Sequence, residues 1–176
     1  MLEEKLKAIV RDIPDFPQPG IVFKDITPIL KDASLCSEIN DAFVDYVKSL
    51  DVQVIAGIES RGFLFGMMLA NKLGIPFVPI RKQGKLPAHT IAESYKLEYG
   101  QATIEIHEDA FTPGTKVLIH DDLLATGGTV VAAAKLIEKL GGEVAGFSFV
   151  INLQFLKGEG RLHRFSTNVI SLVNYV

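Results

Sequence analysis

The sequence has 176 residues, with 48% apolar and 22% charged side chains and a formal net charge of −3. This composition excludes a disordered chain, and the length suits one domain over 1–176. No apolar run is long enough to span a bilayer, the acidic balance argues against a nucleic-acid partner, and the lone Cys36 excludes an intrachain disulfide and fits a cytoplasmic location.

The charges are unevenly distributed along the chain. Between Ser60 and Ala92 there are five basic residues and no acidic one, whereas acidic residues are in excess over the remainder. A cationic stretch within an acidic chain indicates a local site for an anionic ligand, although a solvated loop has the same composition.

Two helical patterns and an irregular segment occupy the N-terminal part. The spacing of Leu2, Leu6, Ile9 and Ile13 predicts a helix over the first dozen residues, and a second helix is predicted over 34–50. The segment 12–30 between them contains four prolines and several large apolar side chains. We expect it to pack against the domain or against a ligand.

Two β-α-β units follow. The first has strands over 52–57 and 75–80 around a helix over 63–73, and the second has strands over 116–119 and 143–153 around a helix over 129–140. Continuous apolar strands that alternate with helices predict an α/β fold, with a central, mostly parallel sheet flanked by helices. Between the units, 95–99 and 102–106 could form an antiparallel excursion, and the polar stretch 81–94 has the length of a lid.

The strongest functional signal is the segment VLIHDDLLATGGT at 117–129. Its loop consists of Ala125, Thr126, Gly127, Gly128 and Thr129. Such a loop would present main-chain N–H groups and two hydroxyls at a helix N-terminus, which suits a phosphate monoester. Asp121 and Asp122 would repel a phosphate, so we expect them to bind the hydroxyls of an attached sugar or to act as indirect partners of a metal. A turn with Asp caps is the alternative, but two glycines at a helix start cost stability.

Two further elements supply cations. The turn Glu59–Gly62 follows the first predicted strand, so Ser60 and Arg61 could hold a second anion. Arg81, Lys82 and Lys85 would suit a pyrophosphate. One phosphate site, one sugar site and one pyrophosphate site together fit 5-phosphoribosyl-1-pyrophosphate.

The segment 117–129 resembles the signature of type I phosphoribosyltransferases. Further segments are similar to that family in the same order over nearly the whole chain: DIPDFPQPGIVFKDITPIL at 12–30, IAGIESRGFLFG at 55–66, RKQGKLP at 81–87 and SYKLEYG at 94–100. The resemblance implies transfer of 5-phosphoribose from 5-phosphoribosyl-1-pyrophosphate to N9 of adenine, giving AMP and pyrophosphate. It also implies a homodimer and the cofactor Mg²⁺, held mainly by the substrate and without direct protein ligands.

The resemblance implies roles for individual residues. Glu98, Arg61 and Lys85 would be catalytic: Glu98 would share a proton with the purine N7, and the two cations would stabilise the leaving pyrophosphate. Residues implied to bind 5-phosphoribosyl-1-pyrophosphate and AMP are Glu59, Ser60, Arg81, Lys82, Tyr99, Asp121, Asp122, Ala125, Thr126, Gly127, Gly128 and Thr129. The Glu59–Ser60 peptide would be cis, and Arg81 would reach across the dimer interface.

For the base, the resemblance implies contacts with Val22, Phe23, Lys24 and Leu153. Adenine would rest on Phe23 with Leu153 opposite, while main-chain groups of Val22 and Lys24 read its polar edge. Residues 1–33 would form the N-terminal helix and a hood over the base, and 81–106 a flexible antiparallel lid.

The chain departs from the family pattern at Lys24, Glu59 and Asn152, where Arg, Asp and a carboxylate are frequent. Two alternatives to adenine transfer stay open. One is a phosphoribosyltransferase for another purine, which would need a side-chain donor for a 6-oxo group. The other is a regulator with the same fold and no catalysis, for which a nucleic-acid-binding extension or the loss of catalytic residues would be typical.

Overall fold

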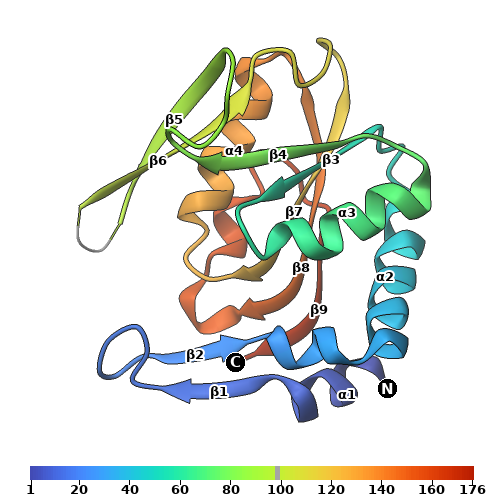
Figure 1. Cartoon of the computed structure of the whole chain (residues 1–176), viewed down its shortest axis with the longest axis vertical. Coiled ribbons are helices and arrows are strands. Elements are labelled where there is room, and N and C mark those ends of the chain that lie inside the picture. Colours follow the sequence, from blue (N-terminus) through green and yellow to red (C-terminus); the bar gives the residue numbers. More distant parts are fainter. Residues whose placement is uncertain (98–99) are drawn as a thin grey trace.

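The computed structural model describes residues 1–97 and 100–176. Within these ranges a seven-stranded sheet forms the centre of the molecule, in the order β5-β6-β4-β3-β7-β8-β9 (Figure 1). The strands are β3 (Val54–Ile58), β4 (Phe77–Lys82), β5 (Thr90–Lys96), β6 (Gln101–His107), β7 (Lys116–Leu124), β8 (Glu143–Leu153) and β9 (Val169–Tyr175). The five adjacent strands β4-β3-β7-β8-β9 are parallel to one another. At the β4 edge, β6 and β5 add an antiparallel hairpin. The predicted α/β fold with a mostly parallel sheet is confirmed.

Helices cover both faces of this sheet. Helix α4 (Gly128–Lys139) packs against one face, whereas α1 (Leu2–Ile9), α2 (Ala33–Val47) and α3 (Gly62–Leu73) lie on the other. Alternate residues of each strand serve the two apolar layers: Ala56 packs with the α4 layer, and its neighbour Ile55 packs with the α2 and α3 layer. The continuous apolar runs in the sequence follow from this two-sided burial.

The N-terminal segment differs from its prediction. Helix α1 ends at Ile9, and Ile13 lies in the short strand β1 (Arg11–Pro14), which pairs antiparallel with β2 (Val22–Asp25). A residue before proline is disfavoured in helical geometry, and Ile13 precedes Pro14, so the helical spacing of Ile13 was misleading. A 3-10 helix, η1 (Thr27–Lys31), follows, and its Ile29 is fully buried. The irregular segment thus packs against the domain through its C-terminal end.

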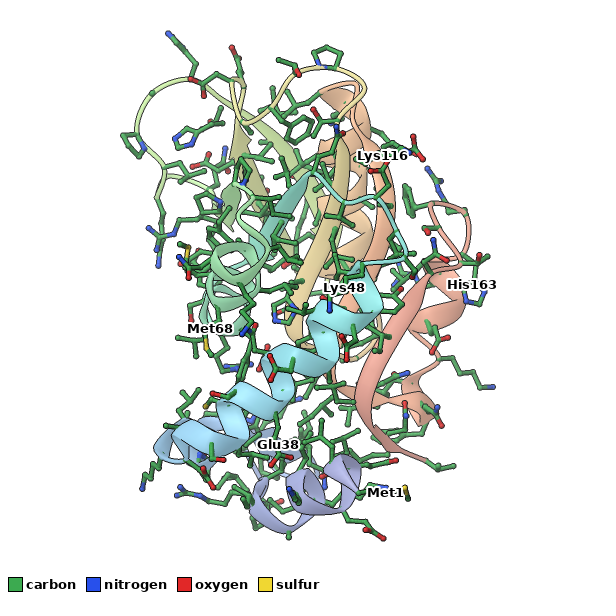
Figure 2. All side chains as sticks on the ribbon, turned by 90° about the vertical axis from the view of Figure 1, so that its right-hand side faces the viewer. Met1, Glu38, Lys48, Met68, Lys116 and His163 are labelled. Atoms are coloured by element: carbon green, nitrogen blue, oxygen red, sulfur yellow. The ribbon has the colours of Figure 1, made fainter. Side chains whose placement is uncertain are left out.

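Other boundaries also moved. Strand β7 continues to Leu124, five residues beyond its predicted end, so the acidic pair lies within the strand. The predicted lid stretch is partly regular, because β5 begins at Thr90 and pairs with β6 along its whole length. Strand β9 was not predicted, and it follows two short 3-10 helices, η2 (Gln154–Leu156) and η3 (Glu159–Arg161). Figure 2 looks onto α2, which crosses in front of the sheet with Lys48 at its C-terminal end. No helix in the described ranges is long and apolar enough to cross a membrane.

Candidate active site

The sheet order creates a crevice between β3 and β7. The chain passes from β3 to β4 on one side and then returns to β7 on the other side of β3. Open parallel sheets bind ligands at such switch points, at the carboxyl ends of the strands. A cavity of about 430 Å³ lies there. It is lined by Ile58, Glu59, Ser60, Arg61, Lys82, Lys85, Tyr95, Ile104, Asp121, Asp122, Leu123 and Thr129.

The turn after β3 is held tightly against β7. The Glu59–Ser60 peptide is cis, as predicted. Helix α3 begins at Gly62, where a Cβ would lie 2.9 Å from the carbonyl oxygen of His120 and 3.0 Å from Oδ1 of Asp121. The absence of a side chain at Gly62 therefore lets the turn approach the acidic end of β7.

The acidic pair is joined to this turn. Arg61 Nε donates to Oδ2 of Asp122, whose side chain is only 5% exposed. Asp121 Oδ1 accepts the main-chain N–H of Asp122 at 2.8 Å. Burial, together with the negative charge of Asp122, raises the pKa of Asp121 well above its usual value. Arg61 also lies over the ring of Phe23, with its Cζ 5.2 Å from the ring centroid.

Glu59 binds the cations that the sequence analysis assigned to pyrophosphate. Its carboxylate accepts from Arg81 Nη2 at 3.0 Å and from the main-chain N–H of Lys82 at 2.7 Å, and it lies 3.1 Å from Lys85 Nζ. Burial alone would raise the pKa of Glu59, but these donors outweigh it and lower the pKa to about 2. Glu59 is therefore an anion within the cationic wall of the cavity. The resemblance implied that Glu59 belongs to this site, but these ion pairs are not visible in the sequence.

The predicted phosphate loop lies between β7 and α4, as expected. Its Gly127 is required by a contact within the chain, whereas the prediction attributed the glycines to contact with a ligand. Gly127 has a φ of +79°, and a Cβ there would lie 2.9 Å from the carbonyl oxygen of Gly158. The close approach is thus made by the chain itself. Arg161 Nη1 donates to the carbonyl oxygen of Thr126 at 2.9 Å, so the segment around η3 supports the loop from outside. Sequence reasoning missed this support, and Gly158, which closely approaches the loop at Gly127, was its visible signal.

The residues assigned to the base are not among those that line the cavity. Val22 and Phe23 belong to β2, and Leu153 ends β8. Within the described residues neither Phe23 nor Leu153 lines the cavity, but Arg61 connects Phe23 to it. Lys24 is directed elsewhere, because its Nζ donates to Asp12 at 2.6 Å and lies 4.0 Å from the Tyr175 ring centroid.

Asn152, the third departure from the family pattern, and the neighbouring-strand residue His120 both have structural partners. Asn152 Nδ2 donates to Glu159 Oε2 at 3.0 Å, which ties the end of β8 to η3. His120 is fully buried with Nδ1 2.8 Å from Ser148 Oγ, and burial lowers its pKa to about 4. His120 is therefore a neutral core side chain. Glu98 and Tyr99 lie outside the described residues.

The cavity offers oxygen ligands but no complete metal site. Among the described residues no group of three or more His, Cys, Asp or Glu side chains could hold a metal ion. Asp121 and Asp122 line the cavity, and hard cations such as Mg²⁺ prefer carboxylate oxygens. The donor chemistry of this acidic pair therefore fits a magnesium ion.

The chain is similar to known proteins over nearly its whole length. The family profile of the phosphoribosyl transferase domain matches residues 27–170. The adenine phosphoribosyltransferase of Cytophaga hutchinsonii is 53% identical over 175 residues, covering 99% of this chain and 97% of that protein. The crystal structure of adenine phosphoribosyltransferase from Thermoanaerobacter pseudethanolicus superposes with a TM-score of 0.95 at 48% identity, covering 99% of this chain and 100% of that one. A Saccharomyces cerevisiae adenine phosphoribosyltransferase, solved with adenine and an imino-altritol bisphosphate, has a TM-score of 0.91 at 39% identity, covering 97% and 98%.

Proposed function

The chain belongs to the phosphoribosyltransferase family, and from this premise we propose that it transfers 5-phosphoribose from 5-phosphoribosyl-1-pyrophosphate to N9 of adenine. The products are AMP and pyrophosphate, so the reaction salvages a purine base. Similarity to adenine phosphoribosyltransferases over nearly the whole chain supports this function. The observation that carries it is the cavity at the β3–β7 switch point, where cationic and acidic side chains face one another.

The two sides of the cavity suit the two ends of the substrate. Ser60, Arg61, Lys82 and Lys85 would face the pyrophosphate, on which negative charge grows as the C1′–O bond breaks. On the β7 side, Asp121 and Asp122 would accept hydrogen bonds from the ribose hydroxyls. The N–H groups of 125–129 would hold the 5′-phosphate at the start of α4. Positioning and charge stabilisation, without covalent catalysis by the protein, supply the rate.

Adenine would be bound next to the turn that carries Arg61. The contact between Arg61 and Phe23 supports a base resting on Phe23 while C1′ faces the cavity. Main-chain carbonyls of 22–24 would accept from the amino group of adenine and would reject a 6-oxo purine, since two acceptors would then face each other. Glu98 remains the proposed acid at N7, on the resemblance of SYKLEYG to the family.

Magnesium would accompany the pyrophosphate. When bound, Mg²⁺ neutralises the charge that develops on the leaving group. The carboxylates of Asp121 and Asp122 are the protein oxygens suited to hold it indirectly, through the ribose hydroxyls.

We also propose that the enzyme acts as a homodimer. On α3 the side chains of Leu64, Met67 and Met68 are 40%, 50% and 37% exposed. Their spacing puts them along one stripe of the helix, and Met68 projects from the molecule in Figure 2. A second copy could cover this stripe. Arg81, which the resemblance directs to a neighbouring site, lies over the ring of Phe63 on the same helix, with its Cζ 6.0 Å from the ring centroid. Sedimentation of Met67→Glu against the unmodified chain tests the dimer.

The remaining assignments concern segments and location. We propose that 1–33 acts as a hood over the base and 81–106 as a lid, within a single domain over 1–176. The hood proposal is supported by the contact of β2 with Arg61, and the lid proposal by the β5–β6 hairpin, whose Tyr95 and Ile104 line the cavity. The buried, free thiol of Cys36 is consistent with a cytoplasmic location.

Pyrophosphate release tests the function. The protein is mixed with 5-phosphoribosyl-1-pyrophosphate, Mg²⁺ and adenine, hypoxanthine or guanine in turn. We expect release with adenine only. Release with hypoxanthine but not adenine would indicate a transferase for another purine, and no release with any base would indicate a regulator.

A further inference from the structure

One carboxylate on the neighbouring strand β6 fixes the loop that carries Lys85. Glu105 lies on β6, and its Oε1 accepts the main-chain N–H groups of Gly84 and Leu86, each at 3.1 Å. These are the two amides that flank Lys85 in the sequence. Oε2 lies 3.3 Å from the hydroxyl of Thr90, at the start of β5. A single side chain thereby holds both sides of Lys85.

The local backbone explains why a carboxylate fits there. Gly84 has a φ of +84°, and the N–H of Lys85 donates to the carbonyl of Lys82, so the chain turns sharply around Lys85. Neighbouring N–H groups in such a turn converge on one point and favour an anion. Glu105 supplies that anion from within the fold, and it is only 5% exposed. The register places Glu105 opposite Arg81 of β4 and Ala92 of β5, in the interior of the hairpin.

The Lys85 side chain extends from this fixed backbone into the cavity. Lys85 lines the cavity, and its Nζ lies 3.1 Å from Glu59. Lys85 is long and half-exposed, so a mobile loop would spread its ammonium group over many positions. Two hydrogen bonds to a charged acceptor restrict the backbone from which the side chain starts.

We propose that Glu105 is a positioning residue for Lys85. By accepting the N–H groups on both sides of Lys85, it keeps the ammonium group at the cavity wall and so strengthens binding of the pyrophosphate end of the substrate without touching it. This proposal rests on the proposed function, in which Lys85 binds pyrophosphate.

Three substitutions separate acceptor geometry from charge. Glu105→Ala removes the acceptor. Glu105→Asp keeps the charge but withdraws the carboxylate by about 1.5 Å, one carbon–carbon bond. Glu105→Gln keeps an oxygen at full length that can accept both N–H groups, while its NH₂ can donate to Thr90. His107→Ala is the matched control, because His107 Nε2 contacts the same loop at Pro87, 2.8 Å away, but not beside Lys85.

Calorimetry with magnesium pyrophosphate and, separately, with AMP gives the test. AMP lacks the pyrophosphate, so its affinity reports whether the rest of the site is intact. We expect Glu105→Ala and Glu105→Asp to weaken pyrophosphate binding about tenfold with AMP affinity within about twofold of the unmodified chain. Glu105→Gln and His107→Ala should bind pyrophosphate nearly as the unmodified chain does. If Glu105→Ala fails to bind AMP, the proposal is judged from the pyrophosphate affinities of Glu105→Asp and Glu105→Gln alone.

A double-substitution cycle tests whether Glu105 acts through Lys85. In a Lys85→Ala background, Glu105→Asp should cost no further pyrophosphate affinity. Equal losses in both backgrounds, or unchanged pyrophosphate binding by both Glu105→Ala and Glu105→Asp, would overturn the proposal. Failure of the proposed function is a different result: the unmodified chain would then form no AMP from adenine, whatever the variants bind.

Discussion

The guanidinium of Arg61 donates from Nε to Oδ2 of Asp122, and this bond joins the turn after β3 to the end of β7. The two residues are assigned to adjacent parts of the same substrate, Arg61 to the pyrophosphate and Asp122 to the ribose. Their bond therefore fixes the distance between the two half-sites before a ligand arrives. Preorganised charges of this kind cost little reorganisation during the reaction.

Loss of Arg61 should reduce both stability and activity. Arg61→Met leaves the buried Asp122 carboxylate without its charged donor. We expect the free energy of unfolding in urea to fall by about 1–3 kcal/mol and kcat/KM to fall by about 100-fold or more. Arg164→Met is the matched control, since its 3.7 Å ion pair with Glu138 is exposed. Equal effects of the two substitutions would contradict the role of Arg61.

Glu59 should compete with pyrophosphate for the same cations. Glu59→Gln retains an acceptor for the N–H of Lys82 but frees Arg81 and Lys85 from a negative charge. We expect magnesium pyrophosphate to bind about three- to tenfold more tightly, as measured by calorimetry. Glu93→Gln controls for lost charge alone, because Glu93 pairs with Lys135 and Lys139 outside the cavity. Weaker binding by Glu59→Gln would show that Glu59 assists the site instead.

Burial of neutral His120 predicts a pH dependence of stability. Its pKa is about 4 in the folded chain and near 6.5 when unfolded, so the unfolded state takes up a proton first as the pH falls. Stability is lost between pH 6.5 and 4 on this account. Asp121, whose pKa is raised, acts in the opposite direction, and Glu59 contributes only below about pH 4.5.

Comparison with a variant isolates the contribution of His120 to the pH dependence of the unfolding free energy. Between pH 7.5 and 5, the unmodified chain should lose about 1–2 kcal/mol more unfolding free energy than His120→Gln, measured in urea at both pH values. Equal losses of unfolding free energy in the two proteins would mean that folding does not lower the pKa of His120.

Sequence patterns predicted the parts of this fold that depend on local chemistry. The parallel sheet followed from apolar strands alternating with helices, and the turn into α4 from its glycines at a helix start. Contacts between distant segments were not visible in the same way. The bonds from Arg161 to Thr126 and from Glu105 to the loop of Lys85 depend on tertiary packing. Strand β9 was not predicted either. Ile13 has helical spacing but lies in β1, because the residue before a proline is disfavoured in a helix.

Gly62 should be intolerant of even a methyl group. Alanine normally stabilises a helix position relative to glycine by about 1 kcal/mol. Here the added Cβ would lie 2.9 Å from the His120 carbonyl oxygen and 3.0 Å from Asp121 Oδ1, so we expect the opposite sign. Gly62→Ala should lower the unfolding free energy by about 1–3 kcal/mol and weaken AMP binding. Gly160→Ala, which meets nothing within 4 Å, should do neither. A stabilised Gly62→Ala variant with normal AMP affinity would contradict the close approach.

The proposed function requires the cavity between β3 and β7 to bind both ends of the substrate. A crystal structure of the chain with AMP and magnesium pyrophosphate would show where each end binds. We expect the 5′-phosphate against the main chain of 125–129, the ribose hydroxyls on Asp121 and Asp122, and the pyrophosphate beside Ser60, Arg61 and Lys85. AMP or pyrophosphate bound away from this crevice would contradict this expectation.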